Sequence, residues 1–172
     1  YIVADAGYGS EANYQHIIDE LNRIPLITYG SYYRDKKKKQ KKKPFVSDNW
    51  VYVETDDLYI CPAKRPVAFK RYSTRKDTYG YERHVKVYEC EDCRECELRS
   101  LCTKAKRNHN RQIHLNPTWE YFKHYTKDKL SNERTKEIYK QRKVDVEPVF
   151  GNLKANLGFT RFHVRGHHQV TN

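Results

Sequence analysis

The sequence has no methionine and only seven glycines among 172 residues, and its mean hydropathy is −1.04. No stretch approaches the roughly 20 apolar residues that a membrane-spanning helix needs, which excludes a helical membrane protein. The start, Tyr1-Ile2-Val3-Ala4, lacks the basic region and the long apolar stretch of a signal peptide. These four residues are instead typical of a buried strand. We therefore expect the chain to be a fragment that begins inside a domain.

Basic and aromatic residues are what the sequence has in quantity. There are 34 lysines and arginines against 22 acidic residues, which gives a net charge of +12 and a pI of about 9.4. Aromatic residues make up 13% of the chain, with 15 tyrosines, and this content argues against general disorder. A basic, folded protein of this kind favours a polyanionic partner, most simply nucleic acid.

The positive charge is concentrated in the middle of the chain. Residues 1–33 have one basic and four acidic groups (−3), residues 34–130 have 25 and 14 (+11), and residues 131–172 have eight and four (+4). Seven of the central charges are the lysines at 36–39 and 41–43. Such a run repels itself and predicts a solvated loop, which still increases affinity for DNA by displacing counterions from phosphates.

The spacing of apolar residues, together with the residues that begin or end helices and turns, predicts an α/β core interrupted by a β-rich insertion. A strand at 1–5, a helix at about 11–22 capped by Ser10, and a strand at 26–29 form a β–α–β unit. Short strands are expected at 50–53, 58–61, 67–69 and 84–88, followed by helices at 116–130 and from 131 onward. Pro148 predicts that the last helix is kinked or divided in two. We therefore divide the chain into core residues 1–33, an inserted module at 34–130, and core residues 131–172.

All five cysteines lie between positions 61 and 102, and four of them follow the spacing Cys90-x2-Cys93-x2-Cys96-x5-Cys102. Clustered thiolates favour a structural zinc ion, and the preferred ligands are Cys61, Cys93, Cys96 and Cys102, with Cys90 as a substitute. An iron–sulfur cluster and a set of free thiols remain alternatives. Disulfides are not expected, because no secretion signal is present and the count is odd.

Two carboxylates occupy positions that suit phosphodiester chemistry. Reactions of this kind commonly use two divalent metal ions held by carboxylates from separate elements. Asp5 ends a strand of the β–α–β unit, where sites in α/β sheets tend to lie. Glu147 follows Lys143 by four residues and precedes Lys154 by seven, so a regular helix would place all three on one face.

Several of these segments together resemble the DDE domain of bacterial insertion-sequence transposases. They are Ala4-Asp5-Ala6-Gly7-Tyr8, the Cys61-Pro62 stretch, the Cys-x2-Cys-x5-Cys pattern, residues 139–154 and residues 161–166. The resemblance implies an RNase H-like fold in which three acidic residues bind Mg²⁺ or Mn²⁺. It implies that Asp5 is the second acid and Glu147 the third, and that Tyr139 and Arg142 handle DNA near the cut end. Four residues separate Arg142 from Glu147 where the commonest related signature has three, which leaves Asp145 as a rival acid.

By the resemblance, Lys154 belongs to the same DNA-handling signature as Tyr139 and Arg142, and the other basic residues that we predict to hold DNA are Lys143, Arg161 and Arg165. By the resemblance, the first acid lies on a strand upstream of Tyr1, so we expect this chain alone to be inactive as an enzyme. In the intact transposase, metal-activated water would cut a strand and the 3′-hydroxyl would attack target DNA. We expect a bacterial, cytoplasmic, nucleoid-associated protein that dimerises on paired DNA ends. The alternatives are a non-catalytic zinc-stapled DNA-binding module and a decayed pseudo-transposase.

Overall fold

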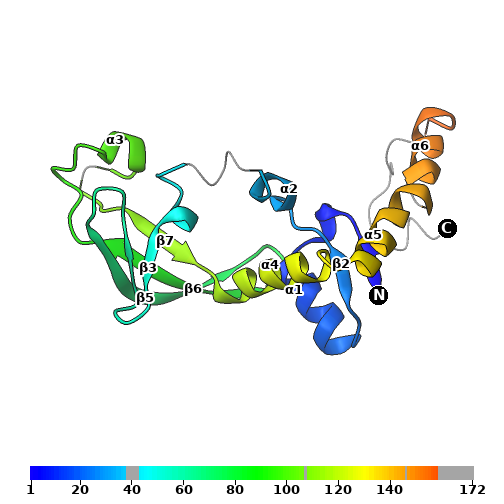
Figure 1. Ribbon diagram of the computed structural model, residues 1–172, viewed down its shortest axis with the longest axis horizontal. Coiled ribbons are helices and arrows are strands. Elements are labelled where there is room, and N and C mark those ends of the chain that lie inside the picture. Colours follow the sequence, from blue (N-terminus) through cyan, green and yellow to red (C-terminus); the bar gives the residue numbers. More distant parts are fainter. Residues whose placement is uncertain (38–42, 107, 146, 159–172) are drawn as a thin grey trace.

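The computed structural model describes residues 1–37, 43–106, 108–145 and 147–158, and for 147 and 150 the backbone only. The chain forms a mixed α/β structure with two sheets (Figure 1). A curled antiparallel sheet lies at one end of the elongated molecule, and a small parallel sheet lies at the other end among helices.

The parallel sheet is the predicted β–α–β unit. Strand β1 (Ile2–Ala4) pairs with β2 (Pro25–Ile27) in parallel register, with Ala4 opposite Ile27. Helix α1 (Glu11–Gln15) lies between them in the chain and continues as a π-helical turn at His16–Glu20. The Ser10 hydroxyl accepts a hydrogen bond from the Asn13 amide at 3.2 Å, so the predicted cap is confirmed.

Two later helices cover this sheet, and aromatic side chains fill the space between them. Helix α4 (Pro117–Lys129) packs against α1 and β2, and α5 (Glu133–Asp145) packs against β1 and β2. The Tyr14 ring stacks on Phe122, with centroids 5.3 Å apart, and Trp119 meets Tyr29 edge-on. The chain leaves this core after β2 through the short helix α2 (Tyr32–Asp35). Helix α4, which the sequence-based division places in the inserted module, thus contributes to the core around β2.

The second sheet contains five antiparallel strands in chain order. They are β3 (Val51–Val53), β4 (Leu58–Ile60), β5 (Pro66–Lys76), β6 (Glu82–Cys90) and β7 (Gln112–Leu115). The hairpin predicted around Asp56-Asp57 is present as β3–β4, and the turn predicted at Tyr79-Gly80 joins β5 to β6. Val67, Tyr88 and Ile113 form the centre of its core with Trp50.

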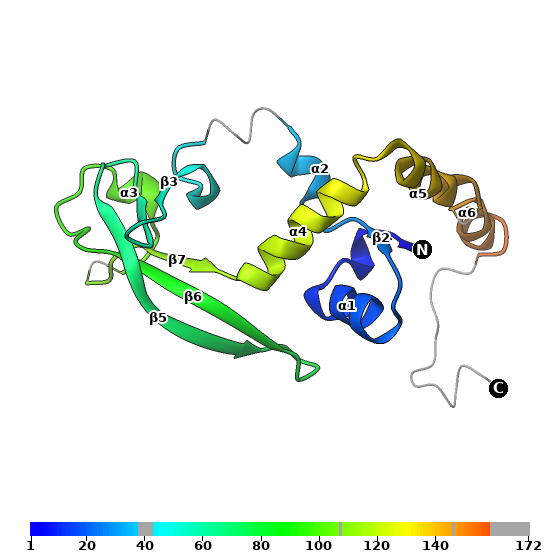
Figure 2. The ribbon, with the colours of Figure 1, turned by 60° about the horizontal axis from the view of Figure 1, so that its bottom comes forward.

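The hairpin of β5 and β6 is longer than the sequence predicts, and β7 was not predicted at all. Both strands extend through segments rich in Lys, Arg and Thr, where polar residues occupy both faces and hide the alternation of a half-buried strand. Figure 2 shows this hairpin as a long curved arm. Its nine residue pairs include a register shift between Phe69 and Arg71.

The C-terminal helical segment is divided, as Pro148 allows. Helix α5 ends at Asp145 and α6 (Glu147–Ala155) begins with Glu147, so that Pro148 occupies the first turn of α6, where its missing amide proton is not needed. At the other end of α5, the serine at 131, where the sequence predicts that this helical segment begins, is not the cap, because Asn132 accepts the hydrogen bond from the Arg134 amide. The Ser131 hydroxyl donates to the Asp128 carbonyl instead.

Some predicted features lie outside the described residues. These are most of the lysine run, at positions 38–42, and both Arg161 and Arg165. Within the part of the chain that the structure describes, no helix is long and apolar enough to cross a membrane.

Asp57 joins three strands of the antiparallel sheet. Its carboxylate accepts hydrogen bonds from the hydroxyls of Tyr88 at 2.6 Å and Tyr52 at 2.7 Å. It also pairs with the Lys86 ammonium at 3.3 Å. The hydrogen bonds from Tyr88 and Tyr52 hold the pKa of Asp57 below its ordinary value. The charged form of Asp57 therefore stabilises the packing of β3 and β4 on β6.

We predict that Asp57→Asn lowers the free energy of unfolding by about 1–2 kcal/mol at pH 7, the scale of hydrogen bonds to a charged group. Because the folded-state pKa is lowered, this contribution is complete above the unfolded pKa near 4 and is lost as the pH falls through the folded pKa. Urea denaturation at pH 7 and at about pH 2 tests this, with Asp56→Asn in the same turn as the control. A loss of equal size at both pH values would contradict it.

Candidate active site and cysteine cluster

Asp5 and Thr28 lie next to each other at the carboxyl edge of the parallel sheet. Each follows the last paired residue of its strand, Ala4 in β1 and Ile27 in β2. The carboxyl edge of parallel strands is where open α/β sheets bind ligands. The expected position of Asp5, at the end of a core strand, is confirmed by this register.

The turn after Asp5 is held tightly against the end of β2. The Asp5 carboxylate accepts a hydrogen bond from the Gly7 amide at 2.8 Å and so caps the single 3-10 turn at Ala6–Tyr8. A Cβ atom at Gly9 would lie 2.2 Å from the Thr28 carbonyl oxygen, so only glycine fits there. Asp5 is exposed, and among the described residues its second carboxylate oxygen has no hydrogen-bond partner. That oxygen faces solvent and suits a hard divalent cation.

Helix α5 brings the predicted DNA-handling residues to this edge. The hydroxyl of Tyr139 is 3.0 Å from the hydroxyl of Thr28, in a buried hydrogen bond between residues far apart in the sequence. The Tyr139 side chain is 8% exposed and belongs to the core cluster of Leu26 and Tyr29. One turn later, the Arg142 guanidinium lies 5.3 Å from the centre of the Tyr139 ring. Tyr139 and Arg142 therefore share the end of the sheet that Asp5 occupies.

Glu147 begins the next helix. The structure describes its backbone, at the first position of α6 directly after α5, and not its side chain. Helices α5 and α6 contact each other, and α5 packs against β1 and β2. Figures 1 and 2 show α6 farther from these two strands than α5. Lys143, Lys154 and the rival acid Asp145 are exposed.

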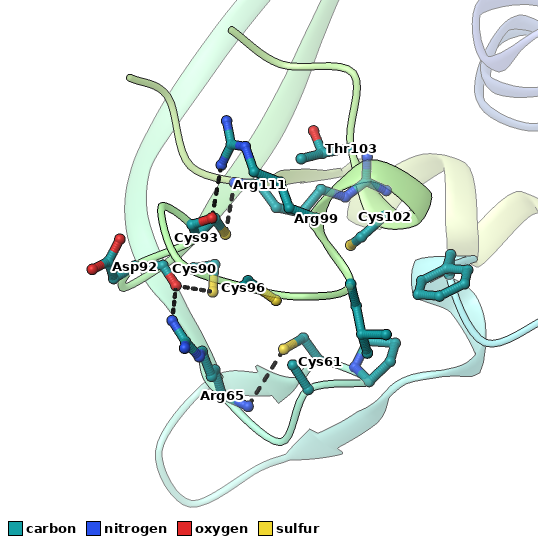
Figure 3. A pocket seen from close by; sticks show the side chains of 14 residues that line it. Cys61, Arg65, Cys90, Asp92, Cys93, Cys96, Arg99, Cys102, Thr103 and Arg111 are labelled. Atoms are coloured by element: carbon teal, nitrogen blue, oxygen red, sulfur yellow. Dashed lines mark hydrogen bonds between the residues drawn. The ribbon is translucent and has the colours of Figure 1, made fainter. Parts of the chain in front are cut away.

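The five cysteines surround one cavity beside the antiparallel sheet. The cavity measures about 20 Å³, close to the space that one small ion or water molecule occupies, and all five cysteines line it (Figure 3). Cys61 follows β4 and Cys90 ends β6, whereas Cys93, Cys96 and Cys102 come from the loop after β6 and its short helix α3 (Arg99–Cys102). All five are free thiols. Cys61 lies far from the other cysteines in the sequence, and the pairing of β4 with β5 and of β5 with β6 brings it next to them.

The pKa values of these thiols show that the sulfur atoms act on one another. Burial, together with the neighbouring Cys93 and Cys61, raises the pKa of Cys90 to about 12. Burial also raises the pKa of Cys102, and Cys61, Cys93 and Cys96 contribute in the same direction. In the absence of a cation these two thiols stay protonated at neutral pH. Among the residues that the structure describes, no three His, Cys, Asp or Glu side chains are arranged to hold a metal ion.

Arg99 organises the cysteine loop from inside. Its guanidinium donates hydrogen bonds to four backbone carbonyl oxygens, those of Cys93, Ala105, Lys106 and His109, over distances of 2.7–3.3 Å. The Arg111 amide also donates to the Cys93 sulfur at 3.4 Å. The loop is thus closed by an arginine that nothing in the sequence pattern distinguishes from its basic neighbours.

The contact between Thr28 and Tyr139 could not be predicted from the sequence. A threonine after a short strand has no distinguishing pattern, and the contact depends on how α5 crosses the sheet. Glu11 is a second example. It is 4% exposed and accepts hydrogen bonds from Asn116 at 2.5 Å and Tyr81 at 3.3 Å. These bonds tie α1 to the start of α4 and to the β5–β6 hairpin.

Comparison with known proteins gives one match. A family model described as the transposase DDE domain matches residues 60–172, which is more than half of the chain. The matched segment begins at the end of β4 and includes the cysteine cluster, Tyr139 and Glu147, whereas Asp5 precedes it. No curated protein and no solved structure matches the chain. With the cysteine loop, α5 and α6 all inside the matched segment, the chain belongs to the family of transposases with a DDE domain.

Proposed function

We propose that this chain is part of the catalytic domain of a DNA transposase that cuts and joins strands at the ends of an insertion sequence. The family match supports a transposase that binds DNA, and such domains have an RNase H-like fold and use divalent metal ions. The observation that carries the catalytic assignment is the hydrogen bond between Thr28 and Tyr139, 3.0 Å long. It joins the helix that carries Tyr139 and Arg142 to the edge of the sheet where Asp5 lies.

We assign the residues as follows. Asp5 and Glu147 bind Mg²⁺ or Mn²⁺, and a further acid upstream of β1 completes the site. When bound, the metal ions lower the pKa of the attacking water and stabilise the leaving oxygen. Asp5 suits this role because its carboxylate is exposed and its orientation is fixed by the Gly7 amide. The DNA-holding residues are Tyr139, Arg142, Lys143, Lys154, Arg161 and Arg165.

The division of labour along the chain follows from these assignments. Residues 1–33 and 131–172 form the catalytic core, and residues 34–130 form the inserted module that binds DNA through its positive charge. Assembly as a dimer on paired DNA ends, in the bacterial cytoplasm at the nucleoid, would complete the reaction. Helix α4 supports the joining of the two parts, because it packs on β2 and follows β7 directly.

We also propose a structural zinc ion at Cys61, Cys93, Cys96 and Cys102. All four line the same small cavity, and the first three each act on the pKa of Cys102. Thiolates that turn into this cavity would supply the four sulfur ligands of a tetrahedral site. Cys90 is the cysteine left over, since its thiol is buried and approaches the Asp92 carbonyl oxygen at 3.9 Å.

The catalytic assignment predicts that Glu147→Gln and Asp5→Asn each reduce Mg²⁺-dependent cleavage of element-end DNA. The rate should fall by on the order of 10²-fold or more, because a group that stabilises reacting charge is lost. The assay measures DNA cleavage on a gel by the protein that is encoded by the open reading frame containing this segment. Glu137→Gln and Asp19→Asn, at exposed positions on the same two parts of the core, are the controls. Full cleavage by Glu147→Gln would overturn the assignment.

The substitution Tyr139→Phe removes the hydroxyl group that contacts Thr28 and keeps the aromatic ring. The hydroxyl is lost and the Thr28 hydroxyl is left buried without it, so the free energy of unfolding should fall by about 1 kcal/mol. Chemical denaturation of the chain measures this. Tyr121→Phe is the matched control, since Tyr121 is 60% exposed on α4. Equal losses in the two variants would show that the Thr28 contact does not position α5.

The zinc proposal predicts about one zinc ion per chain in protein purified without chelators, measured by inductively coupled plasma mass spectrometry. Cys93→Ser and Cys61→Ser should lose the metal and lower the melting temperature, because metal binding is coupled to folding. Cys90→Ser is the control and should keep the zinc. Protein that contains iron or no metal would refute the zinc assignment, and loss of zinc from Cys90→Ser would refute the choice of ligands.

A further inference from the structure

Three nitrogen-bearing side chains meet on one face of the antiparallel sheet, away from both sites described above. Arg71 of β5 lies opposite Val87 of β6, and Val87 lies opposite His114 of β7. Directly opposed residues in an antiparallel sheet share a face, so Arg71 and His114 flank Val87 on the same side. Arg75 lies four residues beyond Arg71 on β5 and therefore also on this face.

Arg75 fixes the state of the His114 ring. Its Nη2 atom is 3.0 Å from the Nδ1 atom of His114. A guanidinium group has donors and no acceptor, so Nδ1 must accept this hydrogen bond and the ring must be neutral. The single proton of the ring is then on Nε2, where it is available as a donor. Burial lowers the pKa of His114, and the charges of Arg75, Arg71 and Arg111 lower it further.

The two arginines are not neutralised within the described part of the chain. Neither Arg71 nor Arg75 forms an ion pair with an acidic side chain among those residues, and both are exposed. The acid nearest in register on this face, Glu89, is occupied, because it pairs with Lys70 at 2.6 Å and accepts a hydrogen bond from Gln112. The two guanidinium groups carry unpaired positive charge on one face of the sheet, and both charges act on His114, so an anion on this face is favoured.

The site is built on a rigid support. Val87 beneath the three side chains is fully buried, and β5 and β6 are paired on both sides of it. Guanidinium groups match the geometry of phosphate with two parallel hydrogen bonds each. The chain carries a net charge of +12, which favours a polyanion over a single anion.

We propose that Arg71, Arg75 and His114 form a phosphodiester-binding site through which the antiparallel sheet holds the backbone of duplex DNA. This inference rests on the proposed function for the identity of the nucleic acid, and it adds a contact outside the catalytic core. The arginines bind phosphate oxygens, and the Nε2 proton of His114 donates to a neighbouring oxygen. Contacts of this kind position DNA without reading its sequence.

The experiment measures the affinity of the full chain for a fluorescent 30-base-pair duplex at several salt concentrations. The double variant Arg71→Gln/Arg75→Gln should reduce the slope of log K against log salt by about 2, since each phosphate contact contributes roughly 0.9. The matched control is Lys76→Gln/Lys104→Gln, which also removes two charges. Lys76 lies on the opposite face of the same strand, and Lys104 lies in the cysteine loop. The slope of log K against log salt should therefore change in the control variant by less than half of the change in Arg71→Gln/Arg75→Gln.

A second measurement reports on the site directly. The ring resonances of His114 in nuclear magnetic resonance spectra should shift on addition of duplex DNA, and not on addition of inorganic phosphate at the same phosphate concentration. A shift with inorganic phosphate alone would overturn the duplex assignment. Thermal melts of each variant establish that the fold is intact.

The outcomes separate this site from the proposed function. If the chain binds DNA and both double variants lower the slope equally, or neither does, the phosphodiester site is refuted and the transposase assignment stands. If the unsubstituted chain shows no salt-dependent binding, the site and the DNA partner are refuted together. Loss of cleavage in Glu147→Gln with unchanged binding would refute neither.

Discussion

The hydrogen bond between Thr28 and Tyr139 is the contact on which the arrangement of the core depends. It joins the carboxyl end of β2 to the middle of α5, two segments separated by 111 positions in the sequence. Around it, Leu26, Tyr29 and Leu130 form an apolar cluster that excludes water from the bond. The apolar packing of α5 on β1 and β2 holds the helix on the sheet, and this hydrogen bond adds a directional contact that favours one register of α5.

The molecule uses charge differently in its two parts. The edge of the parallel sheet depends on few groups that are individually oriented, such as Asp5 with its bond from the Gly7 amide. The antiparallel sheet carries many cations, and its anionic groups are largely consumed by internal pairs, as Asp57 and Glu89 illustrate. The pairing of Asp57 and Glu89 reduces the negative charge that a DNA strand approaching this sheet would meet, which favours binding.

Sequence patterns predicted the elements whose signals are local. Ser10 and Asn116 mark helix starts through their side-chain oxygens, and Pro148 marks one through its missing backbone amide proton, and all three do so in the structure. The full length of β5 could not be predicted, because its polar residues follow no alternation, whereas β7 does alternate (Gln112-Ile113-His114-Leu115) but is only four residues long, which is a weak signal. Contacts between distant segments were also out of reach. The pairing of Thr28 with Tyr139 and the four carbonyl bonds of Arg99 depend on topology, which residue type alone does not encode. The roles of Asp5, Glu147 and the cysteines as metal ligands stay predictions.

One of the two chain connections between the antiparallel sheet and the core is a single residue, whereas the other runs from α2 to β3. Strand β7 ends at Leu115 and helix α4 begins at Pro117, with Asn116 between them held by its bonds to Trp119 and Glu11. A linker of one fixed residue cannot absorb a rotation. A displacement of the sheet would therefore reach α4, which packs on β2, and it would also reach α1 through the hydrogen bond from Tyr81 to Glu11. The antiparallel sheet is therefore joined to the strand end beside Asp5 through a short connection and a packed helix, and not through a flexible linker on this side.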